Sequence, residues 1–362
     1  MKKLIPAIVA LVIVALMALG YMDAEHHSRL HPEAASEPLN VKATLFGHLG
    51  DAYGWEVPFN HSTRIPLPVI VRDHAGSWHV FSSDRVTGGA TYDGFKIVSD
   101  PDSELSGKIV EVLDDGSEVR PWDLSITKNV ACIFIAALIV IAVVMSLRRW
   151  YDREGMKAPR GGRGFVELIV DFVYFDTIRP IMGKHAPRFA PYLLTAFFMI
   201  LTLNLLGLIV IFPGGANVTG NIAVTMVLAL CTFALTTFNG TREYWKEIFW
   251  PEVPVWLKCP VPLMPFIEFL GIFTKPLALM IRLFANMMSG HMVVIVLVTF
   301  IFLFAQMFGT AVGGMTVVFS MAFSLFMLLL DTLISFIQAY VFTLLSALFI
   351  SMALVEPHHV SE

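Results

Sequence analysis

Long apolar runs alternate with short polar segments over most of the chain. The run 126–147 is long enough to cross a bilayer as a helix, and the runs 191–212 and 218–238 predict two further spans. Residues 315–356 contain no Gly and no Pro. As one helix these residues would reach about 63 Å, and residues 277–307 about 46 Å. Since the hydrocarbon core is only about 30 Å thick, we expect two long helices tilted far beyond the usual ~20°.

The N-terminus has the pattern of an export signal. Lys2 and Lys3 precede an apolar run at 4–20, and small residues follow it. This pattern predicts a signal peptide over residues 1–24, with an uncleaved signal anchor as the alternative. In both cases the lysines stay inside and the next segment is exported.

Residues 25–123 form the only polar block. Alternating strand-like runs at 64–72, 78–82 and 108–113 are separated by turn signals at 73–76, 87–89 and 114–116. They predict a small β-rich extracytoplasmic domain. A histidine group, His26, His27 and His31, leaves metal binding open as an alternative to an ordinary surface tail. Because no Cys or regular ligand spacing accompanies these histidines, we expect no metal site.

Loop charges orient the membrane domain, predicted over 124–362. Residues 148–163 hold six basic and two acidic side chains, which places this loop in the cytoplasm. The segment 165–182 is amphipathic and too polar to span, so we expect an interfacial helix there. The loop 239–262 returns to the cytoplasm with three Trp residues suited to the headgroup level. The fold class is therefore an all-α polytopic membrane protein with about five spans.

The composition agrees with a membrane protein. Hydrophobic residues make up 56% and charged residues 15% of the chain, and the mean hydropathy is +0.70. These values exclude a soluble multidomain enzyme, a disordered chain and a nucleic-acid binder. None of the three cysteines lies in the polar block, so no disulfide framework holds that block together.

Only two formal charges lie between residues 276 and 355, Arg282 and Asp331. An arginine in lipid costs from ~2.5 to more than ~10 kcal/mol, and it cannot shed its proton. It must therefore face a partner, water or a negative group. One interpretation is a structural ion pair between Arg282 and Asp331, and the other is an ion pathway.

Helical spacing groups the polar residues of these two segments. Arg282, Asn286 and Ser289 share one face, and Lys275 lies on it seven residues earlier, whereas His291 falls on the opposite face. In the last segment the polar stripe consists of Ser324, Asp331, Ser335 and Gln338. Asp331 and His291 can both titrate, so either could relay protons.

These residues carry a resemblance. The stretch Lys275-Pro276-Leu277 followed by Ile281-Arg282-Leu283-Phe284-Ala285-Asn286, with Gly290-His291 after it, is similar to the signature of subunit a of bacterial F-type ATP synthases. Leu203-Asn204-Leu205-Leu206-Gly207, Ala216-Asn217-Val218-Thr219 and Ile337-Gln338-Ala339-Tyr340 resemble further parts of that family. The resemblance covers roughly 126–356.

The resemblance implies a function and a set of roles. The chain would be a proton-translocating stator subunit of the Fo sector in the bacterial inner membrane, with its C-terminus in the cytoplasm. Its partners would be the c-ring, the peripheral-stalk b subunits, other ATP synthase subunits and the lipid bilayer, with no nucleic acid. It would be no enzyme by itself and would need no cofactor. H⁺ and Na⁺ both stay open, because ring residues decide between them.

The family's essential arginine would be Arg282, with Gln338 near it and facing the ring. Asn286, His291 and Asp331 would line the outer half-channel, with Asn217 at its mouth. Ser289, Ser335 and Lys275 complete the expected pathway. His291 and Asp331 stand where many members have Glu and His, so the acid and the base look exchanged between two helices that should meet.

The chain departs from the family in its long exported domain, to which no role carries over. Two other function classes stay open. A stand-alone secondary transporter or channel would use Arg282 for an anionic substrate and would show broken helices near the middle of the membrane. An adhesive or sensory membrane protein would act through its exported domain.

Overall fold

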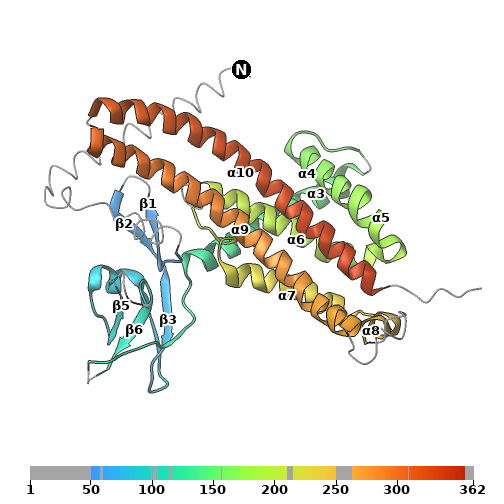
Figure 1. Ribbon diagram of the computed structural model, residues 1–362, viewed down its shortest axis with the longest axis horizontal. Coiled ribbons are helices and arrows are strands. Elements are labelled where there is room, and N and C mark those ends of the chain that lie inside the picture. Colours follow the sequence, from blue (N-terminus) through green and yellow to red (C-terminus); the bar gives the residue numbers. More distant parts are fainter. Residues whose placement is uncertain are drawn as a thin grey trace, which may run out of the picture. The chain divides into compact units, whose positions relative to one another are not determined.

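A computed structural model describes residues 50–57, 60–98, 100, 103, 105–113, 116–155, 157–209, 215–249, 263–308 and 310–354. The chain divides into two compact units, with a boundary between Lys128 and Asn129. The strands belong to the first unit and the long helices to the second (Figure 1). The expected signal and His26, His27 and His31 lie outside the described residues, so these predictions stay untested.

The first unit is β-rich, as the sequence predicts. Its elements are β1 (Gly54–Val57), β2 (Asn60–Pro66), β3 (Pro68–Arg72), β4 (Trp78–Ser82), the 3₁₀ helix η1 (Ser83–Gly89), β5 (Phe95–Ile97), β6 (Ile109–Val112), β7 (Glu118–Val119) and β8 (Trp122–Asp123). The run expected at 64–72 is two strands rather than one. It is interrupted at Leu67, whose N–H turns to the carbonyl of Tyr53 at 3.3 Å.

Three small antiparallel sheets enclose the core of this unit. Their strand orders are β1-β2, β4-β3-β8 and β5-β6-β7. Side chains alternate across a strand with period two, so Val69 and Val71 of β3 and Phe81 of β4 point to one side. There they pack with Phe95 and Ile109. Burial of this apolar face holds the sheets together.

The second unit is helical. Its elements are α3 (Lys128–Glu154), α4 (Gly162–Asp171), the π-helix η2 (Phe172–Ile178), α5 (Arg179–Met182), the 3₁₀ helix η3 (Gly183–His185), α6 (Ala186–Leu208), α7 (Ile222–Phe238), α8 (Arg242–Phe249), α9 (Leu263–Phe308) and α10 (Thr310–Ala353). Within the described residues, four helical stretches are long and apolar enough to cross a membrane. The count reaches five if α7 and α8, bent by 102°, form one span. The prediction of a helical membrane protein with about five spans is confirmed.

Two long helices dominate this unit. At 1.5 Å per residue, the 46 residues of α9 and the 44 of α10 reach about 69 and 66 Å. The two helices run side by side in opposite directions (Figure 1). The helix expected at 277–307 begins earlier, at Leu263, and passes through Pro276. Proline is tolerated in membrane helices, because neighbouring groups satisfy the freed backbone carbonyl.

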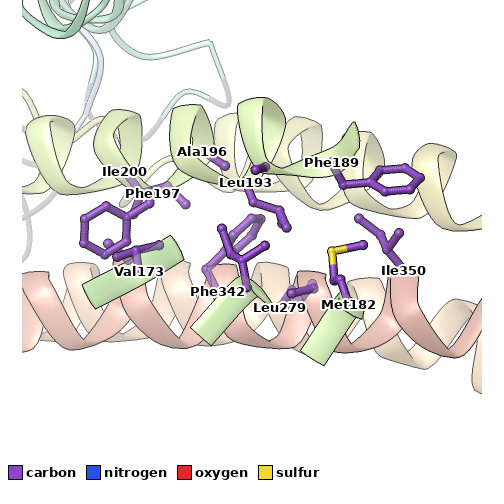
Figure 2. Close-up of a cluster of buried hydrophobic side chains, with 14 of the residues drawn as sticks. Val173, Met182, Phe189, Leu193, Ala196, Phe197, Ile200, Leu279, Phe342 and Ile350 are labelled. Atoms are coloured by element: carbon purple, nitrogen blue, oxygen red, sulfur yellow. The ribbon is translucent and has the colours of Figure 1, made fainter. Parts of the chain in front are cut away.

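The helical core joins α6, α9 and α10 with the segment before α6. Figure 2 shows Val173 and Met182 packed with Phe197, Phe342 and Ile350. Among these, Val173, Phe197 and Ile350 are fully buried. The segment 165–182, expected as an interfacial helix, is helical and packs its apolar side on α10, where Phe172 stacks on Tyr340 at 5.4 Å. Its depth in the bilayer stays a prediction.

A histidine between two carboxylates marks the edge of the β-rich unit. The Nε2 of His79 lies 3.1 Å from an oxygen of Asp73, and its Nδ1 contacts Asp93. The hydrogen bond to Asp73, followed by the bond to Asp93, raises the pKa of His79 above its ordinary value of 6.5. The bonds from His79 and from the Ser77 N–H lower the pKa of Asp73 below 3.8.

These two shifts predict a stability window for the unit. The contribution of His79 is complete below pH 6.5 and is lost as the pH rises through its raised pKa. The contribution of Asp73 is complete above pH 3.8 and is lost as the pH falls through its lowered pKa. Protection factors of the β3 and β4 amides in the full-length protein, which correct for the pH dependence of the intrinsic exchange rate, should therefore be largest between pH 3.8 and pH 6.5. His79→Gln should remove the alkaline limb, and an unchanged limb in this variant would contradict the assignment.

Candidate functional site

Arg282 lies on the outer surface of the helical unit. On α9 it is exposed, whereas Leu279 and Leu283 point inward and are 2% and 1% exposed. Asn286 and Ser289, which share the helical face of Arg282, are half-buried and exposed. The guanidinium group is therefore presented to whatever surrounds this unit.

Asp331 lies on the inner side instead. It is 7% exposed, and its carboxylate sits against the backbone of Gly290. A Cβ added to Gly290 would lie 2.8 Å from Oδ1, 3.1 Å from Cγ and 3.2 Å from Oδ2 of Asp331. Only a residue without a side chain lets α9 and α10 approach this closely. The contact thus brings Asp331 next to the residue that precedes His291.

The structural ion pair left open by the sequence does not form. Among the described residues, no ion pair joins Arg282 to Asp331. Arg282 is eight residues from Gly290, hence about 12 Å along α9 from the level of Asp331. Gln338 is seven residues from Asp331, about 10.5 Å in the same direction along the antiparallel α10. Arg282 and Gln338 therefore stand at similar heights, although Gln338 is only 8% exposed.

A buried polar network joins α6 and α10 to the segment before α7. Asn204 of α6 is fully buried, accepts a hydrogen bond from the Thr219 hydroxyl at 2.7 Å and approaches the Ser335 carbonyl at 3.5 Å. The Ser335 hydroxyl is also buried and donates to the carbonyl of Asp331 at 2.7 Å. Because polar groups in a membrane interior need partners, this network fixes the helices around Asp331.

Asn217 and His291 lie beside this network. The Asn217 side chain accepts from the Gly220 N–H at 3.0 Å and lies 4.0 Å from the sulfur of Met288 on α9. His291 faces α6, because a Cβ on Gly207 would lie 3.5 Å from its Nε2. We name the set Asn204, Gly207, Asn217, Thr219, Gly290, His291, Asp331 and Ser335 the polar centre.

Lys275 and Ser324 are placed apart from the polar centre. The Nζ of Lys275 lies 5.7 Å from the ring centroid of Phe349. Lys275 also lines a small pocket with Thr232 and Tyr244. Lys275 thus turns toward α10 and α7. Ser324 is half-buried, seven residues from Asp331.

Sequence reasoning did not assign Asn204, Thr219 or the two close glycines to the site. Asn204 is a polar residue inside an apolar span, which is a signal that could have identified it. The tight packing at Gly207 and Gly290 depends on which helices lie next to each other. The spacing of residues along one sequence does not predict these neighbours. The polar centre and the exposed Arg282 define a polytopic membrane protein with a titratable interior and a fixed charge on its surface.

Comparison with known proteins identifies the family. The protein-family model described as ATP synthase A chain matches residues 130–351 of this chain. The chain is 40% identical over 252 residues to ATP synthase subunit a of Chloroherpeton thalassium, covering 68% of this chain and 71% of that one. It is 44% identical over 245 residues to subunit a of Myxococcus xanthus, covering 66% and 75%.

A relative from Anaeromyxobacter sp. strain Fw109-5, also named ATP synthase subunit a, is 32% identical over 351 residues, 94% of this chain and 77% of that protein. The chain belongs to the family of ATP synthase A chains, which confirms the resemblance. A second family model, a domain of unknown function (DUF8433), matches residues 44–124 and thus the β-rich unit.

The contact between Gly290 and Asp331 can be tested with a matched pair of glycines. Gly290→Ala should lower the free energy of unfolding of the purified protein by about 1–3 kcal/mol, because the added methyl group displaces the carboxylate or separates the helices. Gly271 on the same helix has no neighbour within 4 Å of the Cβ position. Gly271→Ala should leave the stability unchanged or raise it, and equal losses in both variants would contradict the close contact.

Proposed function

We propose that Arg282 is the fixed charge past which a rotor carboxylate moves, and that the polar centre forms the titratable part of an ion path beside it. The family assigns the chain to the proton-translocating stator of the ATP synthase membrane sector. The observation that carries the proposal is the separation of the two charges. Arg282 is exposed on α9, and Asp331 is buried where α10 meets α9 at Gly290.

A permanent cation suits the surface position. Arginine keeps its proton at any physiological pH, so it attracts an ionised carboxylate without itself carrying a proton across. In this proposal the ring carboxylate pairs with Arg282 and is discharged when it reaches the polar path. The exposure of Arg282, Asn286 and Ser289 on one face supports a partner at this side. Gln338, at the height of Arg282, lies beneath this surface.

Protons would reach the rotor through the polar centre. Asp331 and His291 are its titratable members, placed on two helices that meet at Gly290. Asn217 would stand at the mouth of the path, and the buried amide of Asn204 would hold the helices around it. Asn286 and Ser289 continue the polar groups toward Arg282.

The two long helices support a stator that follows a curved partner. With lengths of about 69 and 66 Å, α9 and α10 are each more than twice as long as a hydrocarbon core of about 30 Å is thick. We propose that α9 and α10 cross at a steep inclination along the c-ring. Peripheral-stalk b subunits would contact the chain elsewhere, and catalysis would reside on soluble subunits. We place the chain in the bacterial inner membrane, with the β-rich unit outside and the C-terminus in the cytoplasm.

The stand-alone transporter receives no support from the helices around Arg282. Its distinguishing feature is a helix broken near the middle of the membrane. The described residues of α9 and α10 form continuous helices on both sides of Arg282 and Asp331.

Removing the fixed charge tests the role of Arg282. Arg282→Ala should abolish ATP-driven proton pumping in inverted vesicles, while the complex still assembles and hydrolyses ATP. Thr332→Ala is a matched control, because Thr332 is an exposed polar residue of α10 whose hydroxyl bonds only within its helix, to Leu328. Normal pumping by the Arg282→Ala complex would reject the role.

Exchanging the acid and the base tests the ion path. His291→Asp and Asp331→His alone should each slow pumping severalfold, because each leaves two like groups on helices that meet. The double variant should recover much of the rate, since it restores one acid and one base. If the fold reduction in pumping rate of the double variant equals the product of the two single fold reductions, the two side chains act independently. That result would contradict the proposal.

A further inference from the structure

The β-rich unit exposes a face that no function so far explains. In the sheet β4-β3-β8, Trp78, Arg72 and Trp122 form one row, since Arg72 pairs with Trp78 on one side and Trp122 on the other. Val80 and Ile70 pair in the next row, and Leu124 extends that row through its N–H bond to the Ile70 carbonyl at 2.9 Å. We name these six residues the tryptophan face.

The tryptophan face is turned away from the core of the unit. Its members alternate along β3 and β4 with the buried Val69, Val71 and Phe81. Trp122 is 74% exposed, Val80 70%, Leu124 64% and Trp78 53%. A contiguous exposed patch of large apolar side chains marks an interaction surface.

The chemistry of the face matches a lipid headgroup layer. Tryptophan is enriched at membrane interfaces, where its ring lies among apolar groups and its N–H meets water or headgroups. Arg72 stands between the two tryptophans, with its guanidinium carbon 5.8 Å from the centroid of the Trp78 ring. Arg72 and Arg120 also line one groove with Trp122, so this groove offers two guanidinium groups to a phosphate. The groove's carboxylates, Asp73 and Glu111, already accept hydrogen bonds from His79 and the His74 N–H.

The covalent chain keeps the face close to a bilayer. Five residues lie between Trp122 and Lys128, the first residue of α3, so the two Cα atoms are at most about 22 Å apart. The segment stays attached to the unit, because the Ile126 N–H bonds to the Pro68 carbonyl at 3.1 Å and the Lys128 N–H to the Ala52 carbonyl at 2.8 Å. The apolar part of α3 starts two residues later, at Val130. The unit therefore has no free linker that could carry it away from the membrane.

We propose that the tryptophan face rests on the phospholipid headgroup layer of the bilayer that α3 crosses. Trp78, Trp122, Val80 and Leu124 would enter the interface, and Arg72 would bind lipid phosphate. This seating would anchor the β-rich unit to the bilayer. It does not depend on the roles given to Arg282 or the polar centre.

Photocrosslinking identifies what covers the face. Benzoylphenylalanine is placed at Val80 in the full-length chain within its assembled complex, in vesicles of phosphatidylcholine and phosphatidylglycerol. The matched control is the same residue at Asp84, which is exposed on η1 outside the face. After illumination, mass spectrometry measures phospholipid adducts. Adducts at position 80 should exceed those at 84 severalfold.

A second set of variants separates seating from folding. Trp122→Ser should reduce the lipid adduct at position 80 severalfold and Trp122→Phe should retain it, while hydrogen exchange of β3 stays unchanged in both. Equal lipid adducts at positions 80 and 84 would overturn the proposal. Adducts at position 80 made mainly with a subunit of the complex, or with a second copy of this chain, would overturn it as well, because they would show a protein on the face.

Discussion

The contact between the Asp331 carboxylate and the bare backbone of Gly290 is the one on which the interior of the helical unit depends. A carboxyl group inside a membrane is tolerated only where the protein encloses it and gives the polar groups around it hydrogen-bond partners. The glycine lets α9 approach α10 closely enough to do so. Ser335, Asn204 and Thr219 then find hydrogen-bond partners around the same point. At this point the apolar packing of the helices is supplemented by polar groups that lipid could not satisfy.

This arrangement gives α9 two chemically different positions. Arg282 keeps its charge and is exposed, whereas Gly290, about two turns further on, contacts the buried Asp331, a titratable group. A rotary ion path needs both kinds of group, because a leak follows if the separating charge itself takes up protons. The helical geometry keeps the two about 12 Å apart along the axis. In the proposed function, they would act on the same passing carboxylate in turn without neutralising each other.

Much of this was predictable from the sequence, and the exceptions have physical causes. The spans, the β-rich unit and the two long helices follow from the hydropathy and spacing of residues. Arg282 and Asp331 stand out because a charge in an apolar segment is costly. The start of α9 at Leu263 was missed, since Pro276 suggests a boundary in water but is tolerated between membrane helices. Asn204 and Thr219 were missed because their importance depends on packing between distant segments.

One residue lies between the end of α9 at Phe308 and the start of α10 at Thr310. So short a connection leaves the two helices no freedom to enter the lipid independently during biosynthesis. Asp331 is enclosed at Gly290 of α9, so insertion of α10 alone would expose this carboxyl group to lipid. The pair should instead leave the insertion machinery together as a preformed hairpin. Biogenesis of this subunit would then require that more than ninety residues be synthesised and retained before either helix is released into the bilayer.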